Sequence, residues 1–541
     1  MKKILETPNM KRTLIIIIFV LCFKYNYAQQ LPGDSLISDF KCFIKYLEET
    51  HPDPYSSFGG KLFFHKSAFD IEQGLKSGAS KEQFANTLST FLSKLEDGHT
   101  RINLPNVENV SDLLFPLSLR TYSDGLMIIV APEQNKELIG CKVKSVNQIS
   151  VDTLIDRLRK QSIVENTYGA YAKLANWMSS LEYMKRLISG ITKNVTLELE
   201  CEGKSLQFEL SYLSKKEYEN LKSTYRPKWS KINENEYMYF DFLDLQKQVM
   251  YFRMSSIQSR EQFLAMKNYG WPNLQNQLEY FYKDYIRRDM PENIDEAIDG
   301  IPVLSEVFRN MLEEMKKNKS KFLIIDLRDN GGGWTPIVPA TLYQLYGDKY
   351  LEKDMNINFY RMISHLYMQK LGTSLEKFNA ENESDYNYGD YVFLIENNEK
   401  KSIEETRNDF VKNIFGGISE FVLDLNGHPV YSPEKVFVIT NENTFSAAFH
   451  YAFYLWKMGA TIVGVPSAQS PNTFMENTDF ILPYTGLKGT ISNSVQLFLP
   501  TDDRRAKIFY PDIMLTWSDY KKYNFDKYSD LLFLIDSLKL K

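Results

Sequence analysis

The chain has 541 residues, a formal net charge of −5, and 43% hydrophobic and 25% charged residues. This length exceeds one ordinary domain, and the composition excludes a mainly disordered chain. The slight acidity provides no basic surface for nucleic acid, so no nucleic-acid partner is expected. Four cysteines and six histidines in this length exclude a disulfide scaffold and a histidine-rich metal cluster.

The first 28 residues have the pattern of an export signal. Basic residues precede a short apolar run at residues 14–23, and Ala28 offers a small residue before a cut. The run is shorter than the roughly 20 residues that cross a bilayer. We expect removal of residues 1–28, a periplasmic or extracellular location, and no stable membrane insertion. An uncleaved membrane anchor is the alternative.

Cysteines are few in the mature chain, where Cys42, Cys141 and Cys201 remain. All three stand in apolar or strand-like contexts, and free cysteines in such contexts are usually buried. They are therefore interpreted as buried thiols.

Residues 29–100 are predicted to form an N-terminal helical subdomain. Apolar residues at 36, 40, 43, 44 and 47 recur at helical spacing, and residues 81–95 repeat this pattern. The first helix should end before Pro52, because a residue preceding proline avoids the α region. The second gives way to the sharp break Glu-Asp-Gly-His-Thr at residues 96–100.

Residues 101–213 are predicted to form a small β-rich module. Short apolar or alternating runs lie at residues 126–130, 141–146, 195–200 and 206–210, and a short helix is expected at 151–158. The stretch from Gly140 resembles the carboxylate-side strand region of a PDZ-like domain. Residues 214–235 are polar and are interpreted as a connector.

Residues 236–541 are predicted to form an α/β domain. Continuous apolar runs at 321–327, 436–440 and 460–464 are typical of buried parallel strands, and a helical pattern separates the last two. The expected architecture is a mostly parallel sheet with covering helices. Residues 346–432 are too long for a plain crossover and are interpreted as an insertion over the sheet edge or the site.

Two motifs follow neighbouring strands of this sheet. Asp-Leu-Arg-Asp-Asn-Gly-Gly-Gly-Trp ends at Trp334, and its glycine amides could hold an oxyanion or simply make a tight turn. Ser446 opens the next helix beside small alanines, as a nucleophile or as a helix cap. The ends of parallel strands share one edge of a sheet, so we expect the two motifs to be neighbours.

A serine nucleophile needs a base, and the sequence offers two histidines. His99 lies in the break between helix and strand, where it could instead be a capping residue. His450 lies one helical turn after Ser446, where a partly buried helix side chain is the favoured interpretation. Both stay open on residue pattern alone.

At this point the sequence resembles the tail-specific, or C-terminal-processing, serine peptidases. The resemblance is carried by DLRDNGGG, FVITNENTFSAA, ATIVGVP and the Tyr-Pro-Asp-Ile-Met segment at 510–514, and it extends to LEDGHT and EETHPDPY. No lysine lies between Lys457 and Lys488, which argues against the Ser–Lys branch of the family. The branch of the tricorn core and the interphotoreceptor retinoid-binding protein repeats fits better.

The resemblance implies a role for each matching residue. Ser446 would be the nucleophile and His99 the base, and the amides of Gly331 or Gly332 and of Ala447 would form the oxyanion hole. The acid that orients the histidine does not map onto one position. Its candidates are Asp502, Asp503 and Glu476.

Three functions follow from these features. The first is an exported serine peptidase that cleaves polypeptides without a metal or organic cofactor, its PDZ-like module presenting a peptide tail by strand addition. The second is a catalytically silent peptide- or lipid-binding protein on the same scaffold. The third, an α/β-hydrolase esterase, is disfavoured because Ser446 lacks the Gly-x-Ser-x-Gly pattern. Retention of Ser446 and His99 together favours the peptidase, whose oligomeric state is left open.

Overall fold

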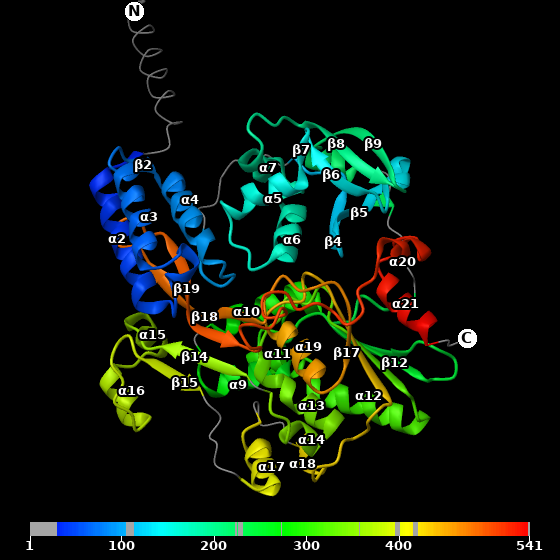
Figure 1. The fold of residues 1–541 in the computed structure, drawn as a ribbon. Helices are drawn as coiled ribbons and strands as arrows, with labels where there is room; N and C mark the ends of the chain where they lie inside the picture. The colour runs from blue at the N-terminus through cyan, green and yellow to red at the C-terminus, as the bar shows by residue number, and fades with distance from the viewer. Residues whose placement is uncertain are drawn as a thin grey trace, which may run out of the picture.

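The structure, a computed structural model, describes residues 30–103, 113–221, 224–225, 231–271, 273–355, 357–394, 401–414 and 420–538. The predicted signal peptide lies outside the described residues. Helices and strands are mixed along the chain, so the predicted α/β class is confirmed. Figure 1 shows a blue helical part, a cyan module, and a larger part coloured from green to orange. No described helix combines the length and apolar character needed to cross a bilayer.

The N-terminal part contains three helices, α2 (Gly33–Thr50), α3 (Lys61–Leu75) and α4 (Lys81–Leu92). The apolar residues spaced along α2 are all buried: Leu36, Phe40, Phe43, Ile44 and Leu47. The chain turns to extended backbone at His51, directly before Pro52. A capping box formed by Ser80 and Gln83 begins α4.

The short elements around these helices are β1 (Gln30–Leu31), η2 (Ser56–Phe58), β2 (Ala79–Ser80), η3 (Ser93–Leu95) and β3 (Arg101–Ile102).

The module that follows contains a sheet in the order β10-β5-β6-β8-β9, with β4 paired to β5 and β7 paired to β6. Its strands are β4 (Ser118–Tyr122), β5 (Gly125–Pro132), β6 (Lys142–Val146), β7 (Ile149–Ser150), β8 (Asn194–Cys201), β9 (Lys204–Ser211) and β10 (Thr224–Tyr225). The predicted connector therefore adds a strand, β10, and the short helix α8 (Lys215–Glu219) to this module.

The module also contains η4 (Glu133–Leu138) and the helices α5 (Val151–Arg159), α6 (Thr167–Met178) and α7 (Leu181–Leu187). Only α5 was expected. The apolar sides of all three helices join one core with the sheet.

The large C-terminal part is built on a sheet in the order β11-β12-β13-β16-β17, in which all pairs except β11–β12 are parallel. The strands are β11 (Met238–Phe242), β12 (Val249–Met254), β13 (Phe322–Asp326), β16 (Lys435–Thr440) and β17 (Thr461–Gly464). The predicted parallel sheet is confirmed.

Successive side chains of these strands enter two different cores. Phe252, Ile325 and Val438 face a core shared with the covering helices. Tyr251, Ile324 and Phe437 face a second core with the C-terminal helices α20 (Trp517–Lys522) and α21 (Ser529–Ser537). Burial on both faces explains why the strands are continuously apolar.

The core that contains Phe252, Ile325 and Val438 is covered by helices that precede and follow β13 in the chain. They are α9 (Arg260–Asn268), α10 (Leu274–Phe281), η5 (Tyr282–Ile286), α11 (Ile294–Asp299), α12 (Leu304–Asn318), η6 (Thr335–Ile337), α13 (Val338–Tyr346) and α19 (Ala447–Lys457).

A second, antiparallel sheet in the order β15-β14-β19-β18 lies beside the helical part, and β3 pairs with β19 (Figure 1). Its strands are β14 (Asn358–Met362), β15 (Tyr391–Leu394), β18 (Asn472–Ile481) and β19 (Lys488–Leu497). The predicted insertion thus supplies β14 and β15. It also supplies α14 (Asp348–Leu351), α15 (His365–Leu371), α16 (Leu375–Glu381), α17 (Ile403–Lys412) and α18 (Glu420–Leu423).

Two of the cysteines are joined, contrary to the expectation of buried thiols. Cys141 and Cys201 form a disulfide across the neighbouring strands β6 and β8, and among the described residues Cys42 is the free cysteine. The sequence pattern concealed this pairing because the two residues are separated by 60 positions and meet only through the sheet register.

Removing the disulfide should destabilise the β-rich module. The bond closes a long loop, and bonds of this kind typically contribute about 2–4 kcal/mol to the free energy of unfolding. We expect the Cys141→Ser, Cys201→Ser double variant to lose about that much of the free energy of unfolding. The measurement is unfolding in urea, monitored through the protection of the module's backbone amides from hydrogen exchange. Cys42→Ser is the matched control, and equal behaviour of the two variants would contradict the expectation.

Candidate active site

The glycine-rich turn at residues 326–334 leaves the carboxyl end of β13 and is held from several sides. The Arg328 guanidinium lies buried between the carboxylates of Asp326, at 2.6 Å, and Asp530, at 3.1 Å. These partners offset the cost of burying its charge. The Asn330 side chain donates to a β12 carbonyl at 3.0 Å. The turn is therefore fixed before any ligand arrives.

Ser446 stands between β16 and α19 in an unusual backbone conformation, with φ of 54° and ψ of −126°. A positive φ is strained for a non-glycine residue, and such strain concentrates at functional sites. The Ser446 side chain makes no capping hydrogen bond to α19. The helix-cap interpretation is thus not supported, and Ser446 is half-buried in the turn between the strand and the helix.

The turn and the serine meet at Gly332. Its φ is 100°, and a Cβ atom placed on it would lie 2.7 Å from Ser446 Cβ and 2.8 Å from the Ala447 nitrogen. Real Cβ atoms do not approach so closely, so only glycine fits. The structure therefore brings the two sequence motifs together, as the parallel pairing of β13 with β16 led us to expect.

The three backbone N–H groups predicted to form the oxyanion hole are not equally free to bind an oxyanion. The Gly332 N–H donates to Asn330 Oδ1 at 3.0 Å, so this amide is already engaged, which corrects part of the expectation. The Ser446 N–H donates to Gln469 Oε1. Among the described residues, no acceptor is found for the amides of Gly331 or Ala447. Gly331 is exposed with open space around it, and Ala447 begins a helix, where partial positive charge gathers.

His99 lies in the loop between η3 and β3. Its backbone N–H donates to Asp97 Oδ1 at 2.9 Å, and its carbonyl accepts from the Thr490 hydroxyl at 2.8 Å. The His99 ring centre is 5.6 Å from that of Phe445, the residue before Ser446. Burial lowers the pKa of His99, although the charge of Asp97 opposes this effect. The imidazole is therefore neutral, as a general base must be.

The described contacts include no hydrogen bond between Ser446 Oγ and the His99 ring. Catalytic hydrogen bonds are often long without substrate and tighten when it binds. The structure brings His99 beside the segment that carries Ser446 without joining the two side chains.

Asp97 is the carboxylate next to His99, and residue pattern alone did not single it out. It is completely buried, with Oδ2 at 3.3 Å from His51 Nε2. His51 Nδ1 accepts from the Asp53 N–H at 3.2 Å, so its proton is on Nε2, facing the carboxylate. Burial raises the pKa of Asp97, but the contacts with His51, His99 and Thr100 prevail and lower it to about 2.

None of the three predicted orienting acids contacts His99 among the described residues. Asp503 pairs with Arg505 at 3.1 Å, and Glu476 pairs with Arg361 at 2.6 Å. Asp502 is exposed. The resemblance does not map this acid onto one position, and the carboxylate beside His99 is that of Asp97.

His450 is buried with both ring nitrogens engaged. Nδ1 lies 2.8 Å from the Thr335 hydroxyl, and Nε2 lies 2.9 Å from Gln496 Oε1. Burial lowers the pKa of His450 to about 4. These contacts describe a helix side chain that holds η6 and β19 to α19, and they leave no ring nitrogen for Ser446.

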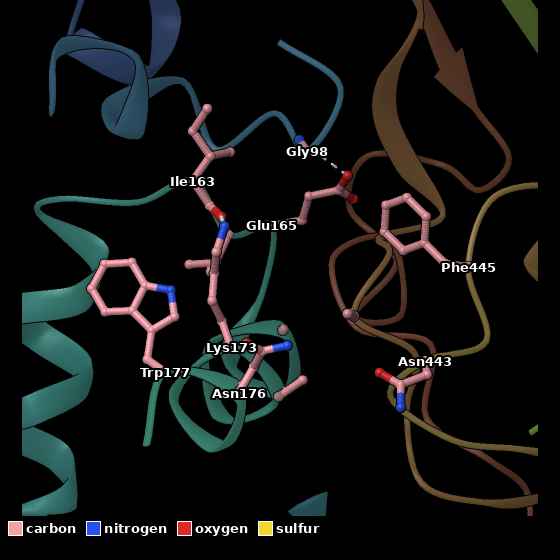
Figure 2. Close-up of a pocket in the computed structure, with 12 residues that line it drawn as sticks. Gly98, Ile163, Glu165, Lys173, Asn176, Trp177, Asn443 and Phe445 are labelled. Atoms are coloured by element: carbon pink, nitrogen blue, oxygen red, sulfur yellow. Dashed lines mark hydrogen bonds between the residues drawn. The ribbon is translucent and has the colours of Figure 1, made fainter. Parts of the chain in front are cut away.

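A pocket of about 380 Å³ opens beside the residues that precede the serine and the histidine. Figure 2 shows it between Gly98 and Phe445 on one side and residues of α6 on the other. Glu165 reaches into this wall, where it accepts the Gly98 N–H at 3.3 Å and the Ser470 N–H at 2.8 Å. A side chain at position 98 would meet Glu165 Oε1 at 2.6 Å. Glycine before His99 thus makes room for this carboxyl group.

Replacing Gly332 by alanine should disrupt the site. The added methyl group collides with backbone atoms on both sides of Ser446, and overpacking of this kind costs about 1–3 kcal/mol. We expect a lower melting temperature and loss of Ser446 reactivity toward a serine-directed phosphonate. Gly74→Ala, on an open helical face, is the control. A reactive Gly332→Ala variant would show that the close approach is not required.

Glu165 should make stability depend on pH. Burial raises its pKa from near 4.5 to about 8. Between these values the unfolded chain loses the proton and the folded chain keeps it, so the free energy of unfolding falls as pH rises. We expect Glu165→Gln to remove a decline of roughly 3–5 kcal/mol between pH 4.5 and 8. Urea unfolding at several pH values tests this, with exposed Glu219→Gln as control; an unchanged slope would contradict it.

Residues 298–496 match the profile described as Peptidase family S41. The matched segment contains the glycine-rich turn and Ser446 and leaves His99 outside. None of the curated proteins compared matches the chain.

Two solved structures of CPAF share the fold over most of the chain. Mature CPAF aligns with a TM-score of 0.57 and 14% identity over 92% of this chain and 96% of that one. Mature CPAF complexed with lactacystin aligns with a TM-score of 0.55 and 15% identity over 92% of this chain and 97% of that one. The photosystem II D1 C-terminal processing protease aligns with a TM-score of 0.38 and 13% identity over 90% of this chain and 94% of that one. The glycine-rich turn and Ser446 both lie inside the segment that resembles peptidase family S41, and this resemblance indicates a serine peptidase.

Proposed function

We propose that this peptidase cleaves polypeptides with Ser446 as nucleophile and His99 as general base. The observation that carries the proposal is the setting of Ser446: a strained turn, packed against Gly332, followed in the chain by the unengaged amide of Ala447. The unengaged amide of Gly331 directly precedes Gly332 in the chain. A nucleophile and oxyanion donors in one fixed place are the requirements for acyl transfer.

The reaction follows from these positions. Ser446 Oγ attacks the peptide carbonyl while His99 accepts the hydroxyl proton, and the resulting oxyanion lies between the amides of Gly331 and Ala447. His99 then gives the proton to the departing amine as the carbon–nitrogen bond breaks. Water, deprotonated by His99, hydrolyses the acyl ester and restores the serine. Every step uses groups of this chain.

Asp97 acts on this chemistry as a positioning residue. Its carboxylate holds the His99 backbone N–H, and His51 holds the carboxylate from behind. The negative charge of Asp97 also stabilises the imidazolium that forms when His99 takes the proton.

The substrate would lie extended along the β-rich module. The pocket beside Phe445 shares Ala172, Asn176 and Asn443 with a second pocket of about 400 Å³, bordered by α6 and by β4. Strand β4 pairs with β5 along one edge only among the described residues. The Thr121 N–H on its other edge is buried and donates to Glu442, so the part of this edge open to a peptide is at Ser118 and Leu119, which line the second pocket. Such an edge accepts an extended peptide by strand addition, the role proposed for a PDZ-like module.

We also propose an exported location. The Cys141–Cys201 disulfide supports it, because such bonds persist in oxidising compartments. The export pattern of residues 1–28 supports it independently.

A serine-directed phosphonate with an intact-mass readout tests the site. We expect wild type to gain one probe mass, and Ser446→Ala and His99→Ala to label at least about a thousandfold more slowly. Because burial lowers the pKa of His99, labelling should persist below pH 6.5 and fall only in more acidic solution. The same spectrum reports whether the chain purified from its producing cells begins after Ala28.

His450→Ala is the matched control, since both of its ring nitrogens serve α19 packing. Labelling that survives in His99→Ala and disappears in a folded His450→Ala would assign the base to His450. A folded wild-type chain that never labels would favour the silent peptide- or lipid-binding protein.

A further inference from the structure

The pocket beside the nucleophile holds a lysine without a carboxylate partner. Lys173, on α6, lines the pocket and is half-buried. Its Nζ donates to the Ile163 carbonyl at 3.2 Å, and a lysine ammonium has further donors left after one such bond. Among the described residues no carboxylate pairs with it.

Glu165 shares the pocket and does not neutralise this charge. Figure 2 shows its side chain directed toward Gly98, on the side of the pocket away from the Lys173 amine. Both carboxyl oxygens accept backbone N–H groups, one from Gly98 and one from Ser470. Burial also raises the pKa of Glu165 to about 8, so the group carries little charge near neutral pH. The pocket as a whole is therefore positive.

Other polar groups complete the site. Asn176 lies on the same helix face, and its side chain is exposed toward the pocket. Asn443 closes the opposite wall, and its amide nitrogen donates to Asp329 at 3.0 Å, which leaves the second amide hydrogen available as a donor. The indole of Trp177 forms an apolar wall. A pocket of about 380 Å³ accommodates one side chain or one chain end.

We propose that this pocket is a carboxylate-binding subsite in which Lys173 pairs with an acidic group of the substrate next to the scissile bond. The inference rests on the proposed function and adds a substrate class to it. The carboxylate belongs to an Asp or Glu side chain of the substrate.

The place of the pocket and the poor solvation of the Lys173 ammonium both support this assignment. The pocket wall includes Phe445 and Gly98, which directly precede Ser446 and His99, so an occupant would be adjacent to the reacting carbonyl. A half-buried ammonium without a counter-ion is poorly solvated, and an incoming carboxylate would restore its interactions. A charge-assisted hydrogen bond of this kind changes affinity by about tenfold or more.

Matched phosphonate probes test the side-chain source. Two peptidyl phosphonates, identical except for Glu or Gln beside the reactive phosphorus, are compared by their labelling rates at Ser446. We expect the Glu probe to label wild type at least about tenfold faster. Lys173→Met should reduce the ratio to about one, and Lys173→Arg should keep most of it. Lys193→Met, an exposed lysine of the same module, should leave the ratio unchanged.

Competing peptides test whether a free C-terminus binds there instead. An alanine tripeptide with a free C-terminal carboxylate and its C-terminal amide are each used to slow labelling by a neutral phosphonate. We expect the two to protect wild type equally. Protection by the free acid at about tenfold lower concentration, lost in Lys173→Met, would overturn the side-chain assignment.

The outcomes separate the two proposals. If no probe labels folded wild type, the proposed function fails. If both probes label equally, the serine is reactive and the carboxylate subsite is wrong. A preference that persists in a folded Lys173→Met variant also overturns the assignment, because the discriminating charge then lies elsewhere. Thermal melting of each variant shows whether Lys173 acts only by holding the Ile163 carbonyl.

Discussion

The close approach of Gly332 to Ser446 is the constraint on which the rest of the site depends. Strands β13 and β16 are paired in parallel, with Asp326 opposite Ile439, so the chain leaves both strands at one edge. The glycine turn can then lie against the serine turn only because position 332 has no side chain. The strain in the Ser446 backbone is maintained by this packing and by the start of α19.

The proposed base, His99, comes from the N-terminal part of the chain and is held by other contacts. Its backbone N–H donates to Asp97, and its carbonyl accepts from the Thr490 hydroxyl of β19. The pairing of β3 with β19 continues the same attachment. In the turn of the hairpin, Asp39 of α2 accepts the backbone N–H groups of Tyr484 and Thr485. The β18–β19 hairpin is thus the connection that brings the helical part to the sheet edge.

Sequence pattern predicted the elements whose signal is local. Continuous apolar runs located β13, β16 and β17, and the glycine and serine motifs identified their meeting point. Helix α6 was missed because its sequence, TYGAYAKLANWM, mixes small, polar and aromatic residues without a clear stripe. Glu165 and Lys173, which border the pocket, stand in or beside this helix and belong to no motif.

Features that depend on distant contacts were not predicted. The disulfide depends on sheet register, and the role of Asp97 depends on a histidine 46 positions earlier, His51, being folded against it. The oxyanion assignment needed the loop conformation, since the amide of Gly332 is engaged by its own neighbour Asn330. The orienting acid could not be placed by chain distance, because the β18–β19 hairpin determines which carboxylates approach the loop.

The pairing of Arg328 with Asp530 links the glycine-rich turn to a residue that is synthesised much later. Asp530 lies on α21, and α20 and α21 pack against one face of the parallel sheet. A growing chain that has already made its glycine turn and its serine still lacks the carboxylate and the apolar cover that support them. The helix that completes the site is thus made after the residues that do the chemistry, and a chain that has not yet reached Asp530 carries no assembled site.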